Sequence, residues 1–215
     1  MTTTLGRTES ILIALFVSVA CPLSAFVLAW WGSALVNAPE NVIKYSALTG
    51  LGLGLLLLAR LKHWTDIFYS VSGVLTVLAY LFWSVIALTF LMGLPIGNLM
   101  LGALAGLYIG RKAVHQGMAA SLFQNQARRV GWFTAAVVGL ISVAMGLLAI
   151  QERETMQVIL GLVGLSRLAA TVFGRIVLVA VAVPVLIVIQ YWLTRVGASW
   201  GFQVGRDGAV ASQNC

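Results

Sequence analysis

Residues 176–193 read IVLVAVAVPVLIVIQYWL, an unbroken run without a charged side chain. At a rise of about 1.5 Å per residue, a helix of this length crosses most of a hydrocarbon core that is about 30 Å thick. A transmembrane strand is disfavoured because the run does not alternate between apolar and polar residues. The stretch therefore predicts a transmembrane helix.

Five further apolar runs in the chain have the same character. The six predicted spans are residues 11–31, 45–59, 67–92, 94–110, 131–150 and 176–193. Only 9% of the 215 residues are charged, whereas a soluble domain carries about 25%. So few charges cannot cover a water-exposed surface. We predict a single integral membrane domain over residues 1–215, an all-α polytopic bundle of about six transmembrane helices.

The positions of the basic residues predict the orientation, because cytoplasmic loops are enriched in Lys and Arg. With the N-terminus inside, the inner segments hold Arg7, Arg60, Lys62, Arg111, Lys112, Arg128, Arg129, Arg195 and Arg206. The outer segments hold Lys44, Arg153, Arg167 and Arg175. This asymmetry favours both termini inside, with a cytoplasmic loop at 111–130 and a cytoplasmic tail at 194–215. It also explains the net charge of +7 through anionic membrane lipid, without nucleic acid as a partner.

A seventh apolar stretch, residues 158–173, is interrupted by Ser166 and Arg167. A further span there would move Arg195 and Arg206 to the outside and weaken the basic asymmetry. We therefore expect an interfacial or re-entrant helix in this stretch and six spans in all.

Small residues recur every four positions in the fourth span, at Asn98, Gly102, Gly106 and Gly110. This spacing places them on one helix face that a second helix can approach closely. We expect Gly102, Gly106 and Gly110 to pack within the chain. A homo-oligomer interface, a partner membrane subunit and a backbone that contacts a ligand are the alternatives.

Polar and basic residues near the spans supply the candidate ligand contacts. Pro22 and Pro184 interrupt the first and sixth helices, and a cavity between these helices and the fourth would be lined by Ser24. Ser46 and Thr49 give the second span a small polar face. Arg167 and Arg175 could hold an anionic group at the outer leaflet, or simply extend to the interface. The predicted set is Ser24, Ser46, Thr49, Asn98, Arg167 and Arg175.

The sequence disfavours an enzyme and predicts no cofactor, metal ligand or catalytic residue. No acidic residue lies well inside a predicted span, and no nucleophile or metal motif is present. His63 and Asp66, with His115, could serve a lipid-modifying enzyme, although such a charged turn is more typical of a topological signal.

Three functions are left open. The first is a small permease or membrane-embedded binding subunit for an uncharged or amphiphilic small molecule or lipid. The others are a non-catalytic structural or assembly component of a membrane complex and the lipid-modifying enzyme. In architecture alone, the chain is similar to small substrate-binding membrane subunits that depend on partner proteins for energy. We expect it in a cell membrane, in particular a prokaryotic inner membrane.

Overall fold

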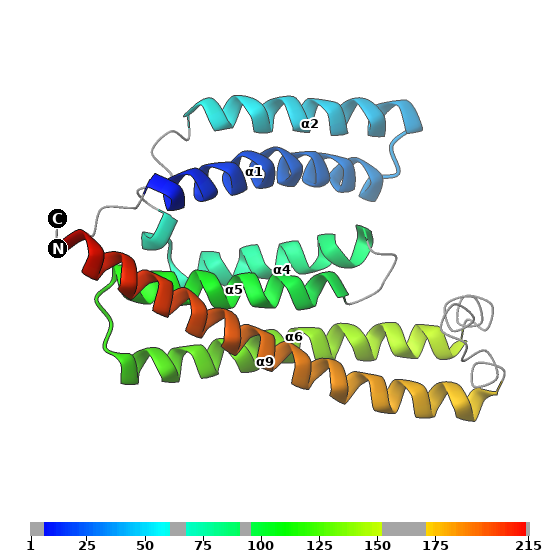
Figure 1. Cartoon of the computed structure of the whole chain (residues 1–215). Coiled ribbons are helices and arrows are strands. Elements are labelled where there is room, and N and C mark those ends of the chain that lie inside the picture. Colours follow the sequence, from blue (N-terminus) through cyan, green and yellow to red (C-terminus); the bar gives the residue numbers. More distant parts are fainter. Residues whose placement is uncertain (1–6, 61–67, 91–95, 152–170, 214–215) are drawn as a thin grey trace. The chain divides into compact units, whose positions relative to one another are not determined.

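A computed structural model describes residues 7–60, 68–90, 96–151 and 171–213, which are helical almost throughout (Figure 1). No strand occurs within these ranges. The chain forms two compact units, residues 1–73 and 74–215, which we call unit 1 and unit 2.

Among the described residues, five helices are long and apolar enough to cross a membrane. These segments are Ile13–Leu35, Glu40–Leu58, Gly73–Phe90, Ala120–Leu148 and Val172–Arg206. They leave many large apolar side chains exposed, such as Leu15, Leu56 and Val188, and lipid solvates such a surface where water does not. The predicted all-α, multi-pass membrane bundle is confirmed, while the orientation of the termini stays a prediction.

Unit 1 contains a helical hairpin of α1 (Arg7–Leu35) and α2 (Glu40–Arg60). Asn37 turns the chain between them with a φ of 51°. Asparagine adopts this left-handed conformation more readily than most residues. The backbone N–H of Ala38 donates to the carbonyl of Ser33 at 3.1 Å, which satisfies a carbonyl group that the end of α1 leaves without a helical partner.

Glycines on α2 allow the two helices of the hairpin to approach closely. A Cβ atom at Gly54 would lie 2.5 Å from the Cα of Pro22. One at Gly50 would lie 2.5 Å from the carbonyl oxygen of Ala25. Pro22 therefore packs directly against the neighbouring helix.

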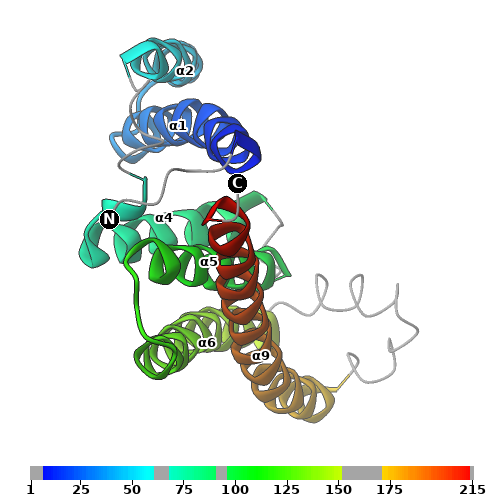
Figure 2. The same ribbon diagram turned by 60° about the vertical axis from the view of Figure 1, so that its left-hand side comes forward.

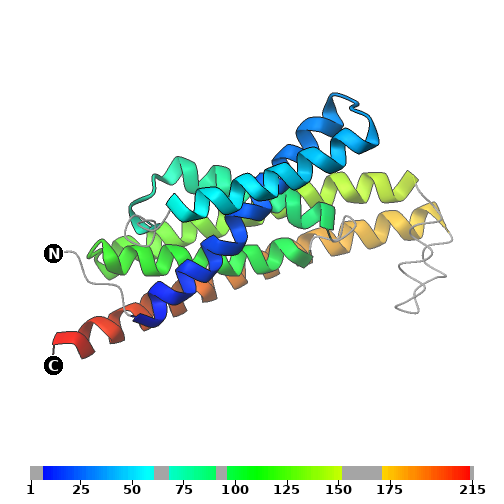
Figure 3. The same cartoon turned by 90° about the horizontal axis from the view of Figure 1, so that it is seen from above.

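The described part of unit 2 contains four helices, of which α9 is the longest (Figures 1 and 2). Their bounds are Gly73–Phe90 for α4, Ile96–His115 for α5, Ala120–Gln151 for α6 and Val172–Gln213 for α9. Helix α9 packs on both α5 and α6 (Figure 3). It therefore joins segments that are distant in the sequence.

The contacts of α9 give the direction of its neighbours. Gly102 faces Gln190 and Gly110 faces Phe202, so α5 and α9 run parallel. Gly146 faces Val179, whereas the earlier Gly131 faces the later Tyr191, so α6 runs antiparallel to α9. The end of α6 and the start of α9 consequently lie at the same end of unit 2.

The helix ends differ most from the predicted span ends in three places. Helix α4 starts at Gly73, after a short 3₁₀ helix, η1 (Phe68–Ser70), instead of at residue 67. Most of the predicted loop at 111–130 is helical, and most of the predicted tail at 194–215 continues α9. The expected interfacial helix at 158–173 falls almost entirely outside the described residues.

A tight turn between α5 and α6 explains why the observed connection is much shorter than the predicted loop at 111–130. Gly117 has a φ of +62°, a conformation that glycine adopts without steric cost. The N–H of Met118 donates to the carbonyl of Ala113 at 2.9 Å, and the N–H of Gly117 donates to that of Val114 at 3.0 Å. These two bonds form the motif that commonly ends a helix, so α6 begins at Ala120.

Candidate functional site

The predicted ligand contacts within the described residues are divided between the two units. In unit 1, Ser46 Oγ donates to Ser33 Oγ at 2.8 Å and so joins α2 to α1. Thr49 Oγ1 donates to the carbonyl of Tyr45 in its own helix at 2.7 Å, on an exposed face. Ser24 is half-buried on α1. Ser46 therefore takes part in packing, and Thr49 faces away from α1.

Arg175 lies at the start of α9 and is buried. Its Nη1 donates to the carbonyl oxygen of Ile150 at 2.6 Å. A cation at the C-terminal end of a helix is favourable because unpaired carbonyl groups gather there. Arg175 thus joins the end of α6 to α9. The predicted companion Arg167 lies outside the described residues.

Asn98 on α5 is fully buried in unit 2. Neither its Oδ1 nor its Nδ2 has a hydrogen-bond partner in the part of the chain that the structure describes. An amide group transferred from water to an apolar environment without a partner costs several kcal/mol, roughly 2–7 depending on the reference state. Asn98 is therefore a position where a further hydrogen-bonding group would be strongly favourable.

A second buried amide, Gln190 on α9, lies one helical turn farther along the same face of α5. Gly102 makes room for it, because a Cβ atom there would overlap the Gln190 Nε2. Gln190 is fully buried, and its Nε2 donates to the hydroxyl of Tyr80 on α4 at 3.4 Å. Its Oε1 accepts no hydrogen bond from any described residue.

Two threonines extend this group of polar side chains to α6. The hydroxyl oxygens of Thr134 and Thr194 lie 2.8 Å apart and are fully buried. Thr194 Oγ1 also lies within donating distance of the Gln190 carbonyl, at 2.9 Å. On α4, Ser84 is buried one turn from Tyr80. We call Tyr80, Ser84, Asn98, Thr134, Gln190 and Thr194 the polar cluster.

Sequence reasoning selected only Asn98 from this cluster. The uncharged polar residues of the predicted set come from the bend near Pro22 and from the small-residue faces of the second and fourth spans. The missed signal was Gln190, an amide near the end of an otherwise apolar run, where an unpaired polar group is costly. The pairing of Thr134 with Thr194 depends on a contact between distant segments, which no local pattern shows.

The polar cluster offers hydrogen bonds and no fixed charge. Its amides and hydroxyl groups both donate and accept. No group of three or more His, Cys, Asp or Glu side chains comes together within the described ranges to hold a metal ion. His63 and Asp66, the residues considered for a lipid-modifying enzyme, fall outside these ranges. The cluster suits an uncharged molecule with hydrogen-bonding groups.

The predicted small-residue face of α5 is occupied by α9. A Cβ atom at Gly106 would overlap the carbonyl oxygen of Thr194, and one at Gly110 would overlap that of Ala198. Glycines on α9 likewise pack against the backbone of α5, since a Cβ atom at Gly201 would lie 2.5 Å from the Leu107 carbonyl oxygen. This face is therefore not open for a second protein.

Basic residues gather where α5 ends and α6 begins, which we call the turn end of unit 2. Lys112 is mostly buried there, with its Nζ 5.7 Å from the centre of the Tyr108 ring. Burial lowers the pKa of Lys112 because it disfavours the charged form. The turn end is the cytoplasmic end in the predicted orientation.

No protein-family model, curated protein or solved structure matches this chain.

Proposed function

We propose that the protein is a membrane-embedded binding subunit or small permease for an uncharged or amphiphilic small molecule, and that the polar cluster binds it. The observation that supports this proposal is Asn98, a fully buried amide whose two polar atoms have no partner among the described residues. Gln190 Oε1 provides a third such atom on the neighbouring helix.

The energetics favour an occupant at this position. Buried polar atoms in proteins are commonly satisfied by ordered water, which makes two to four hydrogen bonds. A ligand that displaces such water gains affinity only if it reproduces those bonds. The ligand should therefore carry both a donor and an acceptor. It should also be neutral, because the cluster contains no opposite charge to offset desolvation.

The proposal includes the cellular setting. The excess of basic residues in the predicted inner segments favours both termini in the cytoplasm, and we place the protein in a prokaryotic inner membrane. Five candidate spans without an acidic cluster supply no evident means of ion coupling. We therefore propose that transport depends on a partner membrane subunit or a second copy of the chain, in contact with membrane lipid.

The test is a thermal-unfolding screen of the full chain in lipid nanodiscs against uncharged metabolites and lipids. A ligand at one hundred times its dissociation constant should stabilise the protein by about 2.7 kcal/mol. We expect Asn98→Leu to abolish this stabilisation without lowering the stability of the ligand-free protein, because leucine removes two unpartnered polar atoms.

Thr49→Val is the matched control, since Thr49 bonds to its own helix on an exposed face of unit 1. It should retain the full ligand response. The proposal fails if no compound stabilises the parental chain in a saturable manner, or if a ligand stabilises Asn98→Leu as much as the parental protein.

A further inference from the structure

A cavity of about 370 Å³ lies at the turn end of unit 2. The turn over residues 117–120 forms one wall. Val114, Met118 and Phe202 supply apolar surface, and Arg206 supplies a charge. The volume lies in the range of small-molecule sites, roughly 300–1,000 Å³. Apolar walls with one charged group are typical of sites that bind amphiphiles.

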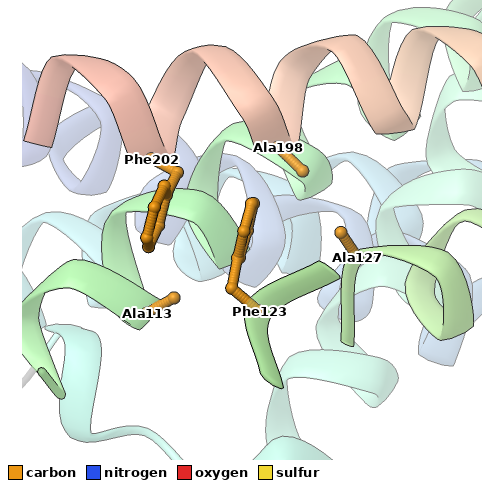
Figure 4. Packing of buried hydrophobic residues seen from close by; sticks show 5 residues of the cluster. All are labelled: Ala113, Phe123, Ala127, Ala198 and Phe202. Atoms are coloured by element: carbon orange, nitrogen blue, oxygen red, sulfur yellow. The ribbon is translucent and has the colours of Figure 1, made fainter. Parts of the chain in front are cut away.

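The apolar part of the cavity rests on a packed aromatic pair. The rings of Phe202 and Phe123 are stacked, with centroids 4.2 Å apart and planes 6° from parallel (Figure 4). Ala113, Ala127 and Ala198 surround them in a buried cluster. Because neighbours on three helices hold Phe202 in place, this wall is preformed, and a ligand would lose little free energy in ordering it.

Arg206 is exposed at the cavity and lies on the next turn of α9 after Phe202. Its guanidinium carbon is 5.9 Å from the centre of the Phe202 ring, which is within the range of a cation–π contact. The contact places the guanidinium beside the apolar wall. A planar guanidinium can donate two parallel hydrogen bonds to a phosphate group.

The half of unit 2 that includes the cavity carries mostly positive charge. Helices α5, α6 and α9 carry Arg111, Lys112, Arg128, Arg129, Arg195 and Arg206 in the half of unit 2 that includes the turn end. The sequence has no Asp or Glu from residue 67 to residue 151, and only Asp207 after Glu154. Such an excess raises the local concentration of anions.

We propose that this cavity binds a phosphate-bearing amphiphile, with the phosphate on Arg206 and the adjoining apolar part against Phe202 and Met118. The site is separate from the polar cluster, and its ligand is charged where the cluster's ligand is neutral. The phosphate can come from an anionic phospholipid of the surrounding membrane or from a soluble phosphate ester. The two sources share the same chemistry at Arg206.

The experiment uses the full chain with two probes. In the first arm, native mass spectrometry measures lipid retention after extraction from nanodiscs with and without phosphatidylglycerol. In the second arm, calorimetry measures the binding of hexyl phosphate, a soluble ester with a short apolar chain, to the protein in phosphatidylcholine nanodiscs. Arg206→Gln is the test variant, and Arg129→Gln, which is exposed but does not line the cavity, is the control.

We expect Arg206→Gln to weaken binding about tenfold or more, since a hydrogen bond to a charged group is lost, and Arg129→Gln to leave it unchanged. This pattern in the lipid arm identifies a phospholipid, and in the calorimetry arm a soluble ester. If the protein binds the probe in neither arm, the proposal is overturned. It is also overturned if Arg206→Gln binds as tightly as the parental protein, or if the two variants lose the same affinity. None of these results bears on the Asn98 test.

Discussion

The α1–α2 hairpin of unit 1 and the α5–α9 pair of unit 2 both bring helices together on glycine. In the hairpin, Gly50 and Gly54 lie on one helix only, and they face Pro22 and Ala25. In the α5–α9 pair, glycines lie on both helices, and all of them except Gly102 face the partner's backbone. Their positions are Gly102, Gly106 and Gly110 on α5, and Gly197 and Gly201 on α9.

The difference lies in what the close approach permits. In the hairpin it gives contact between small side chains and backbone, with the Ser46–Ser33 hydrogen bond beyond it. At Gly102 it gives space to the side-chain amide of Gln190. Close helix approach at glycine therefore serves packing in unit 1, and in unit 2 it also allows a polar side chain to be buried. Three substitutions test this comparison.

The largest effect is expected at Gly106. A leucine side chain there would overlap the backbone of α9 at Thr194 and Ala198, and a backbone cannot move aside as a flexible side chain does. We expect a loss of at least about 3 kcal/mol, at the upper end of overpacking costs, or failure to fold. Thermal unfolding in nanodiscs measures it. Gly52→Leu on α2 should be nearly neutral, because no described atom lies within 4 Å of a Cβ atom at Gly52. An equal loss of stability in this variant would show that overlap with α9 is not the cause of the Gly106→Leu effect.

A smaller effect is expected for Gly54→Ala in the hairpin. The added methyl group would lie 2.5 Å from Pro22 Cα and 3.1 Å from Ala25 Cβ, so the two helices must separate slightly. We expect a cost of about 1–3 kcal/mol. Hydrogen exchange should increase in α1 and α2 and stay unchanged in α5 and α9. Gly32→Ala, which has open space around it, is the control. Faster exchange throughout unit 2 would show that the two units do not respond separately.

The smallest effect is expected for Thr194→Val, which removes the 2.8 Å hydrogen bond to Thr134. Side-chain hydrogen bonds between membrane helices contribute about 0.6 kcal/mol on average. A double-mutant cycle with Thr134→Val should give a coupling of that size. Thr89→Val is the control, because the hydrogen bond of the Thr89 hydroxyl within the described residues is to Val85 in its own helix. A coupling near zero would mean that the threonine pair contributes no stability.

The fold class could be predicted because it depends on local composition. Runs without charge, such as residues 176–193, predict helices whatever their partners are. The four-residue spacing from Asn98 to Gly110 likewise marks a helix face that packs closely. The sequence could not show which helix packs there. Gly197, Gly201 and Gly205 repeat the same spacing, but they lie beyond the last predicted span, within the predicted cytoplasmic tail.

The candidate site was less predictable than the fold. Asn98 could be selected because it shares a face with three glycines. Gln190, Tyr80 and Thr134 lie on three other helices, and only the packing of those helices brings them together. The predicted contacts Ser46 and Arg175 instead hold helices to each other. A polar residue in a span shows that a partner is needed, but it does not show whether the partner is a ligand or the chain itself.

The parallel pairing of α5 with α9 has a consequence for biogenesis. Ribosomes deliver the chain in order, so α5 enters the membrane before α6 and α9 are made. Of the six long helices in the described ranges, α5 alone is not apolar enough to count as a candidate span. Until α9 is synthesised, the glycine face of α5 and Asn98 lack the helix that covers them in the folded protein. We therefore expect newly inserted α5 to be the least stably held of these helices until α9 is made, and truncation before α9 should leave it loosely inserted in the bilayer.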